Sequence, residues 1–386
     1  MNAVVKKKVI NVITTIIAIS SVFIAIYCMI FKFRTVKFDF DRINTLAAKS
    51  ILTRSIFSDF AYKNENINSE PNEFSGFNAF FHANSFQNVK DLPIIPENSS
   101  ETSDTGNQEQ IENSEPLKPK FGEKTYRIIE SQFGSTGIKH ENFFVKNSTN
   151  YTVDIGQELS KFPEINIKTT IKPQVLIFHT HATESYMMAE QGYFCESFYP
   201  RSDDNKKNVI MVGNAVVDSL KKCGINAIHD TTHHDYPSYN GSYARSAKTV
   251  RARLEENPSI QVVIDIHRDS MGDRENGKIK PTFKYAGKKA AQLMIISGCD
   301  LSGKLGFPEW EKNLRLALRL QKCLETMFPG ITRALNFSEV KYNMHLTKGS
   351  LLIEIGSDVN SLNEAVYTGS MLGEALGKVL KSLVNR

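Results

Sequence analysis

The sequence predicts an α/β fold over residues 171–386, a twisted and mostly parallel sheet with helices on both faces. Short apolar runs alternate with segments whose apolar residues recur every three or four positions, the pattern of strands followed by helices. The apolar runs are continuous, which is typical of strands buried on both faces of a parallel sheet. We expect a transmembrane helix and a flexible spacer to precede this domain.

Each expected strand is short and rich in aliphatic or β-branched residues. These strands lie at residues 174–179, 225–230, 260–267, 289–298 and 350–356. Each expected helix has one apolar face, and glycine or proline marks several of the helix ends. These helices lie at residues 208–222, 242–254, 308–327 and 363–384. Because active sites in parallel sheets form beyond the carboxyl ends of the strands, polar residues at those ends are the first candidates for function.

A long apolar segment occupies the N-terminus. Residues 9–31 contain no charged side chain and can form about 35 Å of helix, enough to span a bilayer. Lys6, Lys7 and Lys8 precede it, which favours a cytoplasmic tail over residues 1–8 and an outer location for the rest of the chain. Because no small-residue cleavage site follows, we expect a single-pass anchor in the cell membrane rather than a removed signal peptide.

The composition changes between the anchor and the distal domain. Residues 32–95 are expected to be a membrane-proximal region. Residues 96–117 contain six carboxylates, no Lys or Arg and few aliphatic residues, so they cannot bury enough apolar surface to offset the entropy of ordering. We therefore expect an acidic disordered linker there. Residues 118–170 form a lead-in segment to the domain at 171–386.

Charge and cysteine content exclude several classes of protein. The net charge of +5 is mild and no long basic run is present, so a nucleic-acid partner is not expected. The five cysteines are odd in number and form no C-x-x-C pair. This usage argues against a disulfide framework and against a thiolate zinc site.

Two histidines and a glutamate follow the first expected strand. His179 and His181 are one residue apart, and Glu184 follows His181 at an H-x-x-E spacing. His267 ends another strand, and Glu354 lies near the end of the last one. A catalytic zinc ion takes three nitrogen or oxygen ligands and leaves one position for water. We expect His181, Glu184 and His267 to hold Zn2+ if their strands are neighbours, with Glu354 as the proton carrier.

Other polar residues lie near these positions. Asp265 shares a strand face with His267 and is expected to orient an imidazole. Arg268 is expected on the substrate side, or paired with the acid that follows it. His345, shortly before the last strand, is a second substrate-side candidate. The polar run at 233–235 reads His-His-Asp and is expected to lie mostly apart from the site.

The distal part of the chain contains five separated motifs: "HTHATESY", "NVIMVG", "YNGSYARS", "DIHRD" and "LLIEIGSDVN". In this order they resemble the stage II sporulation protein P family of endospore-forming bacteria, from about Val145 to the C-terminus. The resemblance implies the fold of zinc-dependent N-acetylmuramoyl-L-alanine amidases and related exopeptidases. It implies cleavage of peptidoglycan stem peptides from the glycan, with endopeptidase action on cross-links.

The resemblance also implies a biological setting. Members of this family act in sporulation, during engulfment, in the septal space between mother cell and forespore. Stage II sporulation proteins D and M are the implied partners, with peptidoglycan as substrate. The anchor and the acidic linker match this setting and were inferred independently of it.

The site residues carry over unevenly from the family pattern. His267 matches the third-ligand histidine and Glu354 matches the catalytic glutamate. The first ligand is either His179 or His181, and the position past the strand favours His181. Related amidases take their carboxylate ligand from farther downstream, where this chain has Asp204. Asp204 therefore competes with the ligand glutamate of the H-x-x-E motif, which the spacing favours.

Two other classes of function stay open at this point. One is a zinc peptidase of the carboxypeptidase type. The other is a non-catalytic, wall-binding component of an engulfment complex. The sequence leaves undecided the oligomeric state, the balance between amidase and endopeptidase action, and the restraint on activity.

Overall fold

The structure, a computed structural model, describes residues 115–384, which lie within one compact unit of the chain, Ser75–Arg386. The expected anchor at 9–31, the region at 32–95 and nearly all of the linker at 96–117 lie outside the described residues. Among residues 115–384, no helix combines the length and the apolar character needed to cross a membrane.

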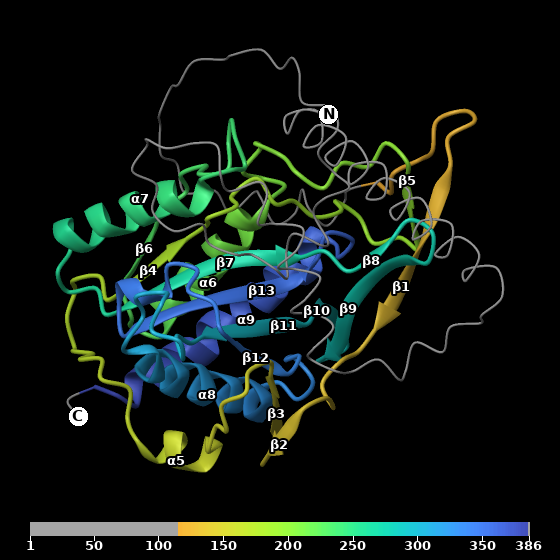
Figure 1. Ribbon diagram of the computed structural model, residues 1–386. Helices are drawn as coiled ribbons and strands as arrows, with labels where there is room; N and C mark the ends of the chain where they lie inside the picture. Colours follow the sequence, from red (N-terminus) through yellow and green to blue (C-terminus); the bar gives the residue numbers. More distant parts are fainter. Residues whose placement is uncertain (1–114, 385–386) are drawn as a thin grey trace, which may run out of the picture. The chain divides into compact units, whose positions relative to one another are not determined.

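An eight-stranded sheet forms the centre of the described part, in the order β2-β3-β12-β11-β13-β7-β4-β6 (Figure 1). The pairs β2–β3 and β11–β13 are antiparallel, and the remaining pairs are parallel. The mostly parallel sheet that the sequence predicts is therefore confirmed. Its strands are β2 (Ile138–His140), β3 (Phe143–Asn147), β4 (Val175–Phe178), β6 (Ala227–His229), β7 (Val262–Asp269), β11 (Leu293–Gly298), β12 (Leu335–Ser338) and β13 (Gly349–Ser357).

Helices lie on both faces of this sheet, as predicted (Figure 1). Ile177 and Ile264 share one core with α6, α8 and α9, whereas Phe178 and Val263 share another with α7. Because side chains alternate along a strand, neighbouring residues of β4 and β7 serve opposite faces. The helices are α5 (Ile155–Ser160), α6 (Val209–Lys222), α7 (Ser242–Glu256), α8 (Trp310–Met327), α9 (Leu362–Lys381) and the 3-10 helix η3 (Met344–Leu346).

Side-chain caps define the starts of α6 and α9. Asn208 Oδ1 accepts a hydrogen bond from Ile210 N at 3.0 Å, and Ser361 forms a reciprocal capping box with Glu364. Such caps satisfy N–H groups that have no partner inside the helix. The first residue of α6 also donates its N–H to Glu184 O at 2.9 Å. The start of α6 thus lies beside the segment that follows β4.

A second, five-stranded sheet contains the path β10-β9-β1-β5, with β8 paired to β9. Its strands are β1 (Thr125–Ser131), β5 (Tyr193–Cys195), β8 (Gly272–Asp273), β9 (Gly277–Tyr285) and β10 (Lys288–Ala291). The lead-in segment at 118–170 supplies β1 to this sheet and both β2 and β3 to the main sheet. It is therefore structurally part of the domain that it precedes in sequence.

The strand expected at 289–298 is two strands in different sheets, which corrects the prediction. Gln292 separates β10 from β11. Its side chain bonds both backbone groups of Phe133 at 2.7 Å, and its Nε2 also donates to Gly330 O at 2.8 Å. These buried bonds hold the chain at the point where it passes from one sheet to the other.

Candidate functional site

The strands that carry the predicted site residues are neighbours in the main sheet. β7 pairs in parallel with β4 on one side and with β13 on the other. Their carboxyl ends therefore lie at one edge, as the sequence analysis required. His267 and Glu354 are register partners across β7 and β13.

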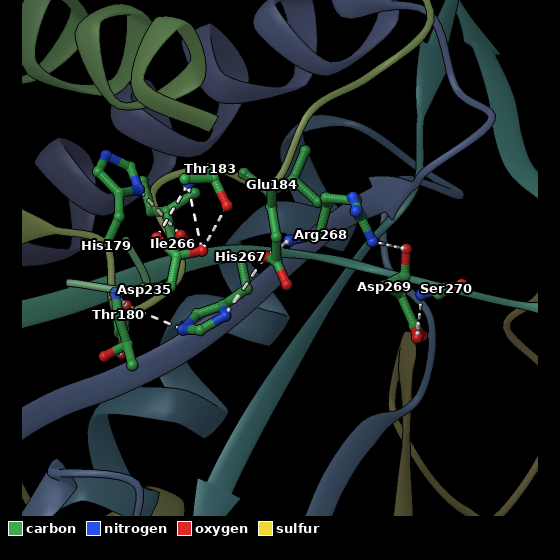
Figure 2. Close-up of polar contacts among 12 residues, drawn as sticks. His179, Thr180, Thr183, Glu184, Asp235, Ile266, His267, Arg268, Asp269 and Ser270 are labelled. Atoms are coloured by element: carbon green, nitrogen blue, oxygen red, sulfur yellow. Dashed lines mark hydrogen bonds and ion pairs between the residues drawn. The ribbon is translucent and has the colours of Figure 1, made fainter. Parts of the chain in front are cut away.

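His267 and Glu184 face each other at this edge. His267 Nδ1 lies 3.5 Å from Glu184 Oε2, and the carboxylate and ring point toward one another (Figure 2). The other ring nitrogen, Nε2, lies 2.9 Å from Asp265 Oδ1, in a contact of charges rather than an aligned hydrogen bond. Burial favours the neutral ring, but the two carboxylates outweigh it and hold the pKa of His267 well above its ordinary value.

His181 completes the cluster. Its ring centroid lies 5.2 Å from that of His267, with the rings nearly perpendicular. Its opposite contact is Tyr239, which stacks on it at 4.4 Å and an interplanar angle of 11°. His181 is 2% exposed, so the ring is held inside the site between these neighbours.

His179 is engaged elsewhere, although it is equally buried. Its Nδ1 lies 2.9 Å from Ile266 O, and its Nε2 lies 2.9 Å from His229 Nε2. Burial and the nearby His229 ring hold the pKa of His179 well below its ordinary value. Both nitrogens of His179 thus serve hydrogen bonds, while His181 lies beside His267. The assignment of the first ligand stays a prediction, and this placement favours His181.

Glu184 is an ionised carboxylate inside the protein. Its Oε2 accepts a hydrogen bond from Arg268 N at 3.1 Å, and its Oε1 lies 3.8 Å from Arg201 Nη2. Burial raises its pKa, but His267, Arg268 and His181 lower the pKa by more, so it lies well below the ordinary value. A buried anion beside two imidazoles is the donor chemistry that a divalent cation requires.

Glu354 differs from the other acid. Burial is the main cause that raises its pKa to about 8, and the charges of Asp269 and Glu184 add to this effect against His267 and Arg333. Within residues 115–384 its Oε2 has no hydrogen-bond partner. A buried carboxyl group with an unsatisfied oxygen and a raised pKa is typical of a proton-transfer residue.

A support network that the sequence analysis missed surrounds these residues. Asp235 accepts hydrogen bonds from Thr183 Oγ1 at 2.6 Å and from Arg201 Nη1 at 2.8 Å. The Arg201 guanidinium lies 4.9 Å over the Tyr239 ring, the ring that stacks on His181. The motif "YNGSYARS" contains Tyr239, but its contact with the site depends on tertiary structure.

The run at 233–235 therefore supports the site more closely than its loop character predicts. His234 Nδ1 lies 2.8 Å from His179 O. Asp235 anchors Thr183, one residue before Glu184. The backbone of the H-x-x-E motif is thus held from this loop.

Three other candidates lie in different surroundings. Arg268 is buried, and its guanidinium donates to Ser185 O and Pro200 O, so it braces the segment after β4. Asp204 is half-exposed and pairs with Lys207 at 3.2 Å. His345 lies in η3, where burial first and then neighbouring cations lower its pKa to about 4. Their predicted roles stay predictions.

The donor set can be tested against zinc. Among the described residues, no three His, Cys, Asp or Glu side chains are arranged as a ready group for a metal ion. Two ligands about 2.1 Å from a tetrahedral ion lie about 3.4 Å apart, and His267 Nδ1 and Glu184 Oε2 are 3.5 Å apart. The carboxylate of Asp265 against the second nitrogen of His267 is also typical of zinc-bound histidines. His267 and Glu184 therefore fit zinc as a pair of ligands, and His181 beside them is a third possible donor.

Comparisons with known proteins can now be set beside this geometry. The stage II sporulation protein P of Bacillus subtilis (strain 168) is 31% identical over 205 residues, which is 50% of this chain and 47% of that protein. The match thus spans about half the length of this curated relative.

Solved amidase structures show weaker similarity. The N-acetylmuramoyl-L-alanine amidase AmiC2 of Nostoc punctiforme is 13% identical, with a TM-score of 0.33, over 55% of this chain and 98% of that one. The CwlD amidase from Clostridioides difficile, solved in complex with the GerS lipoprotein, is 12% identical, with a TM-score of 0.32, over 54% and 99%. TM-scores this low support no conclusion about this chain.

A family model gives the broadest match. The model described as Stage II sporulation protein P (SpoIIP) matches residues 67–377, which is most of the chain. The order of motifs and the cluster at the carboxyl ends of β4, β7 and β13 lie within that match. The chain belongs to the stage II sporulation protein P family.

Proposed function

We propose that this protein is a peptidoglycan hydrolase of sporulation, a zinc-dependent N-acetylmuramoyl-L-alanine amidase with endopeptidase action on cross-links. One observation carries the proposal: Glu354, buried and with an unsatisfied oxygen, is the register partner of His267, which in turn faces Glu184. Family membership supports the setting in sporulation.

The proposed chemistry assigns a role to each buried group. His181, Glu184 and His267 would hold the zinc ion, which supplies Lewis acidity toward the scissile amide carbonyl when bound. Glu354, as carboxylate, accepts a proton from the attacking water and delivers it to the L-alanine nitrogen as the C–N bond breaks. A cation nearby would favour the ionised form of Glu354 and so lower the raised pKa of its carboxyl group.

The supporting residues prepare this geometry. Asp265 fixes which nitrogen of His267 faces Glu184. Arg268 and Asp235 hold the segment after β4 through backbone and hydroxyl contacts. Preorganised donors avoid reorganisation during the reaction, which is where much of the catalytic advantage of a buried site arises.

The proposed location follows from the N-terminal sequence. The apolar segment at 9–31 would anchor the protein in the cell membrane and place the hydrolase domain on the outer side, in the septal space. Stage II sporulation proteins D and M are the proposed partners, on family resemblance alone.

The test uses the full-length chain with zinc and purified sacculi, with mass spectrometry of the released material. The wild type should release intact stem peptides and contain bound zinc, and a chelator should abolish the release. Glu354→Gln should keep the zinc and release nothing. Glu255→Gln, at an exposed position on α7, is the matched control and should be fully active.

Three outcomes would contradict parts of this proposal. Release of stem peptides by Glu354→Gln would exclude the proposed proton carrier. Release of single amino acids would point to an exopeptidase. Binding of sacculi without release by the zinc-loaded wild type would point to a wall-binding component.

A further inference from the structure

A row of side chains continues from the site along the edge of the main sheet. β11 is antiparallel to β13 and β12 is parallel to β11, so the start of β11 and the segment before β12 lie at the edge where β7 and β13 end. Met294 of β11 is the register partner of Glu354, which is the register partner of His267. Directly paired residues point to the same side of a sheet, so these three side chains share the side that carries the site.

Arg333 extends this row by one strand. Thr332, the residue before it, forms a parallel bridge with Leu293 of β11, and Arg333 N donates to Leu293 O at 2.8 Å. The Thr332 hydroxyl accepts a hydrogen bond from Gln321 Nε2 of α8 at 2.8 Å, so Thr332 faces the side of the sheet that α8 covers. Because side chains alternate along an extended chain, Arg333 faces the other side, as Met294 does.

The Arg333 guanidinium reaches back toward the site. Its Nη1 donates to Asp269 Oδ2 at 2.8 Å, although Asp269 lies on β7 and the strand order places β11 and β13 between the two residues. The side chain therefore crosses the sheet edge beside Glu354. After the larger effect of burial, the charges of Asp269 and Arg333 act in opposite directions on the pKa of Glu354, which agrees with this proximity.

Two contacts hold the Arg333 guanidinium, and they leave N–H donors unused. Besides the ion pair with Asp269, its carbon Cζ lies 5.8 Å over the Phe133 ring, and the Gln292 side chain fixes the backbone of Phe133. Among residues 115–384, Nε and Nη2 of Arg333 have no hydrogen-bond partner, and the side chain is 14% exposed. These two nitrogens form one edge of the planar group, and such an edge binds a carboxylate through two parallel hydrogen bonds.

The accessible part of this row is short. Met294, next to Glu354, is half-buried, whereas Ile296 farther along β11 is buried and Gly298 is covered by η3. Two strand steps of about 4.8 Å separate the backbones of Glu354 and Arg333, and the Arg333 side chain shortens this span because it reaches back across it. One or two residues of an extended peptide, at about 3.4 Å each, cover what remains.

We propose that Arg333 binds, through Nε and Nη2, a carboxylate on the stem residue that follows L-alanine, while Asp269 and Phe133 hold the guanidinium in place. The peptidoglycan stem carries such a group there, the α-carboxyl group of a γ-linked D-glutamate, which is either free or amidated. This subsite rests on the proposed function, because it takes Glu354 as the point at which the amide is cleaved. Arg333 thereby selects stems whose second residue keeps its free carboxylate.

The test measures binding of a synthetic stem tripeptide, L-alanyl-γ-D-glutamyl-L-lysine, to the full-length chain with zinc supplied. The glutamyl α-carboxyl group of the peptide is either free or amidated. The wild type should bind the free acid roughly ten times more tightly than the amide. Arg333→Gln should lose this preference and keep the affinity of the wild type for the amide, which also shows that the variant is folded.

Two further variants sharpen the measurement. Arg333→Lys keeps a positive charge beside Asp269 but lacks the planar fork, so it should retain only part of the preference. Arg315→Gln is the matched control, because Arg315 of α8 is 12% exposed and pairs through Nε with Glu158 at 2.9 Å. It removes a comparable guanidinium outside the row and should keep the full preference of the wild type.

The outcomes separate this subsite from the proposed activity. Equal affinity of the wild type for the two peptides would overturn the subsite. A full preference in Arg333→Gln, or an equal loss of affinity for both peptides in that variant, would overturn it as well. None of these results depends on cleavage, so release of stem peptides by the wild type would still support the amidase. Conversely, a wild type that shows the predicted preference but releases nothing from sacculi would keep the subsite and overturn the proposed activity.

Discussion

Two regions of this molecule bury ionisable side chains, and they do so in opposite ways. Where the second sheet meets α9, Lys280 is 1% exposed, with Nζ 2.9 Å from Glu364 Oε1 and 3.0 Å from Glu130 Oε1. At the edge of the main sheet, Glu354 is also buried, but one of its oxygens has no partner among the described residues and its pKa is raised to about 8.

The contrast separates structural charges from chemical ones. Glu364 also accepts hydrogen bonds from Asn360 Nδ2 at 2.8 Å and Ser361 N at 3.1 Å, so the capping box and the ion pair share one carboxylate. A fully bonded buried pair fixes the position of two elements. A buried carboxyl group that lacks bonds destabilises the fold, and its retention is understandable where it performs chemistry.

The largest expected effect tests the chemical side of this comparison. Glu354→Gln should lower the rate of stem-peptide release by about 10²- to 10⁴-fold, because the proton carrier is lost. The free energy of unfolding of the metal-free protein at pH 7 should rise, by up to about 3 kcal/mol. With a pKa of about 8 in the folded state, the carboxyl group must take up a proton on folding that it lacks in the unfolded chain, and Gln removes this cost. Release assays and denaturant titrations measure the two quantities. A large loss of stability would assign Glu354 a structural role.

The next effect tests the structural side. Lys280→Ala leaves Glu364 buried without its cation and should lower the free energy of unfolding by about 3 to 5 kcal/mol. The activity of the folded fraction should stay unchanged. Lys289→Ala is the matched control, because Lys289 pairs with Glu130 at the more exposed rim and should contribute at most about 1 kcal/mol. Equal losses of stability in the two variants would show that the buried ion pair of Lys280 contributes no more than the more exposed pair of Lys289.

A third ionisable group, the half-buried His345, lies away from the cluster of β4, β7 and β13, and its Nδ1 has no hydrogen-bond partner among residues 115–384. Its pKa of about 4 lies below the ordinary 6.5, so the unfolded chain binds more protons between these values. The free energy of unfolding should therefore fall as the pH drops from 6.5 to 4, by about 1 to 2 kcal/mol once its partial exposure is considered. His345→Gln should reduce this slope in denaturant titrations at several pH values. Parallel curves for the variant and the wild type would contradict the prediction.

The smallest effect concerns the capping box at Ser361, which shares Glu364 with the ion pair of Lys280. Ser361→Ala removes a hydrogen bond of 3.3 Å to Glu364 N at the start of α9. The expected loss is about 0.5 kcal/mol, at the low end for N-caps, because the bond is long and the reciprocal contact from Ser361 N remains. Thermal unfolding measures it. A loss as large as that of Lys280→Ala would show that cap and ion pair act as one unit.

The main strands and helices could be predicted from local pattern. Continuous apolar runs mark β4, β7 and β13, and their parallel order places His181, His267 and Glu354 at one edge. The second sheet could not be predicted in this way. β1 and β9 pair across a wide separation in sequence, and Lys280 of β9 forms an ion pair with Glu130 of β1 that no local pattern indicates.

The sequence by itself determined the types of chemistry-bearing side chains and the strand ends at which they lie, because hydrophobic periodicity and residue type are local properties. Only the tertiary structure decided which side chains meet. His179 and His181 are alike in sequence, yet one is held by Ile266 and His229 while the other lies beside His267. Pairings of this kind depend on distant segments that are packed together, and no local pattern encodes their distance or the resulting shift in pKa.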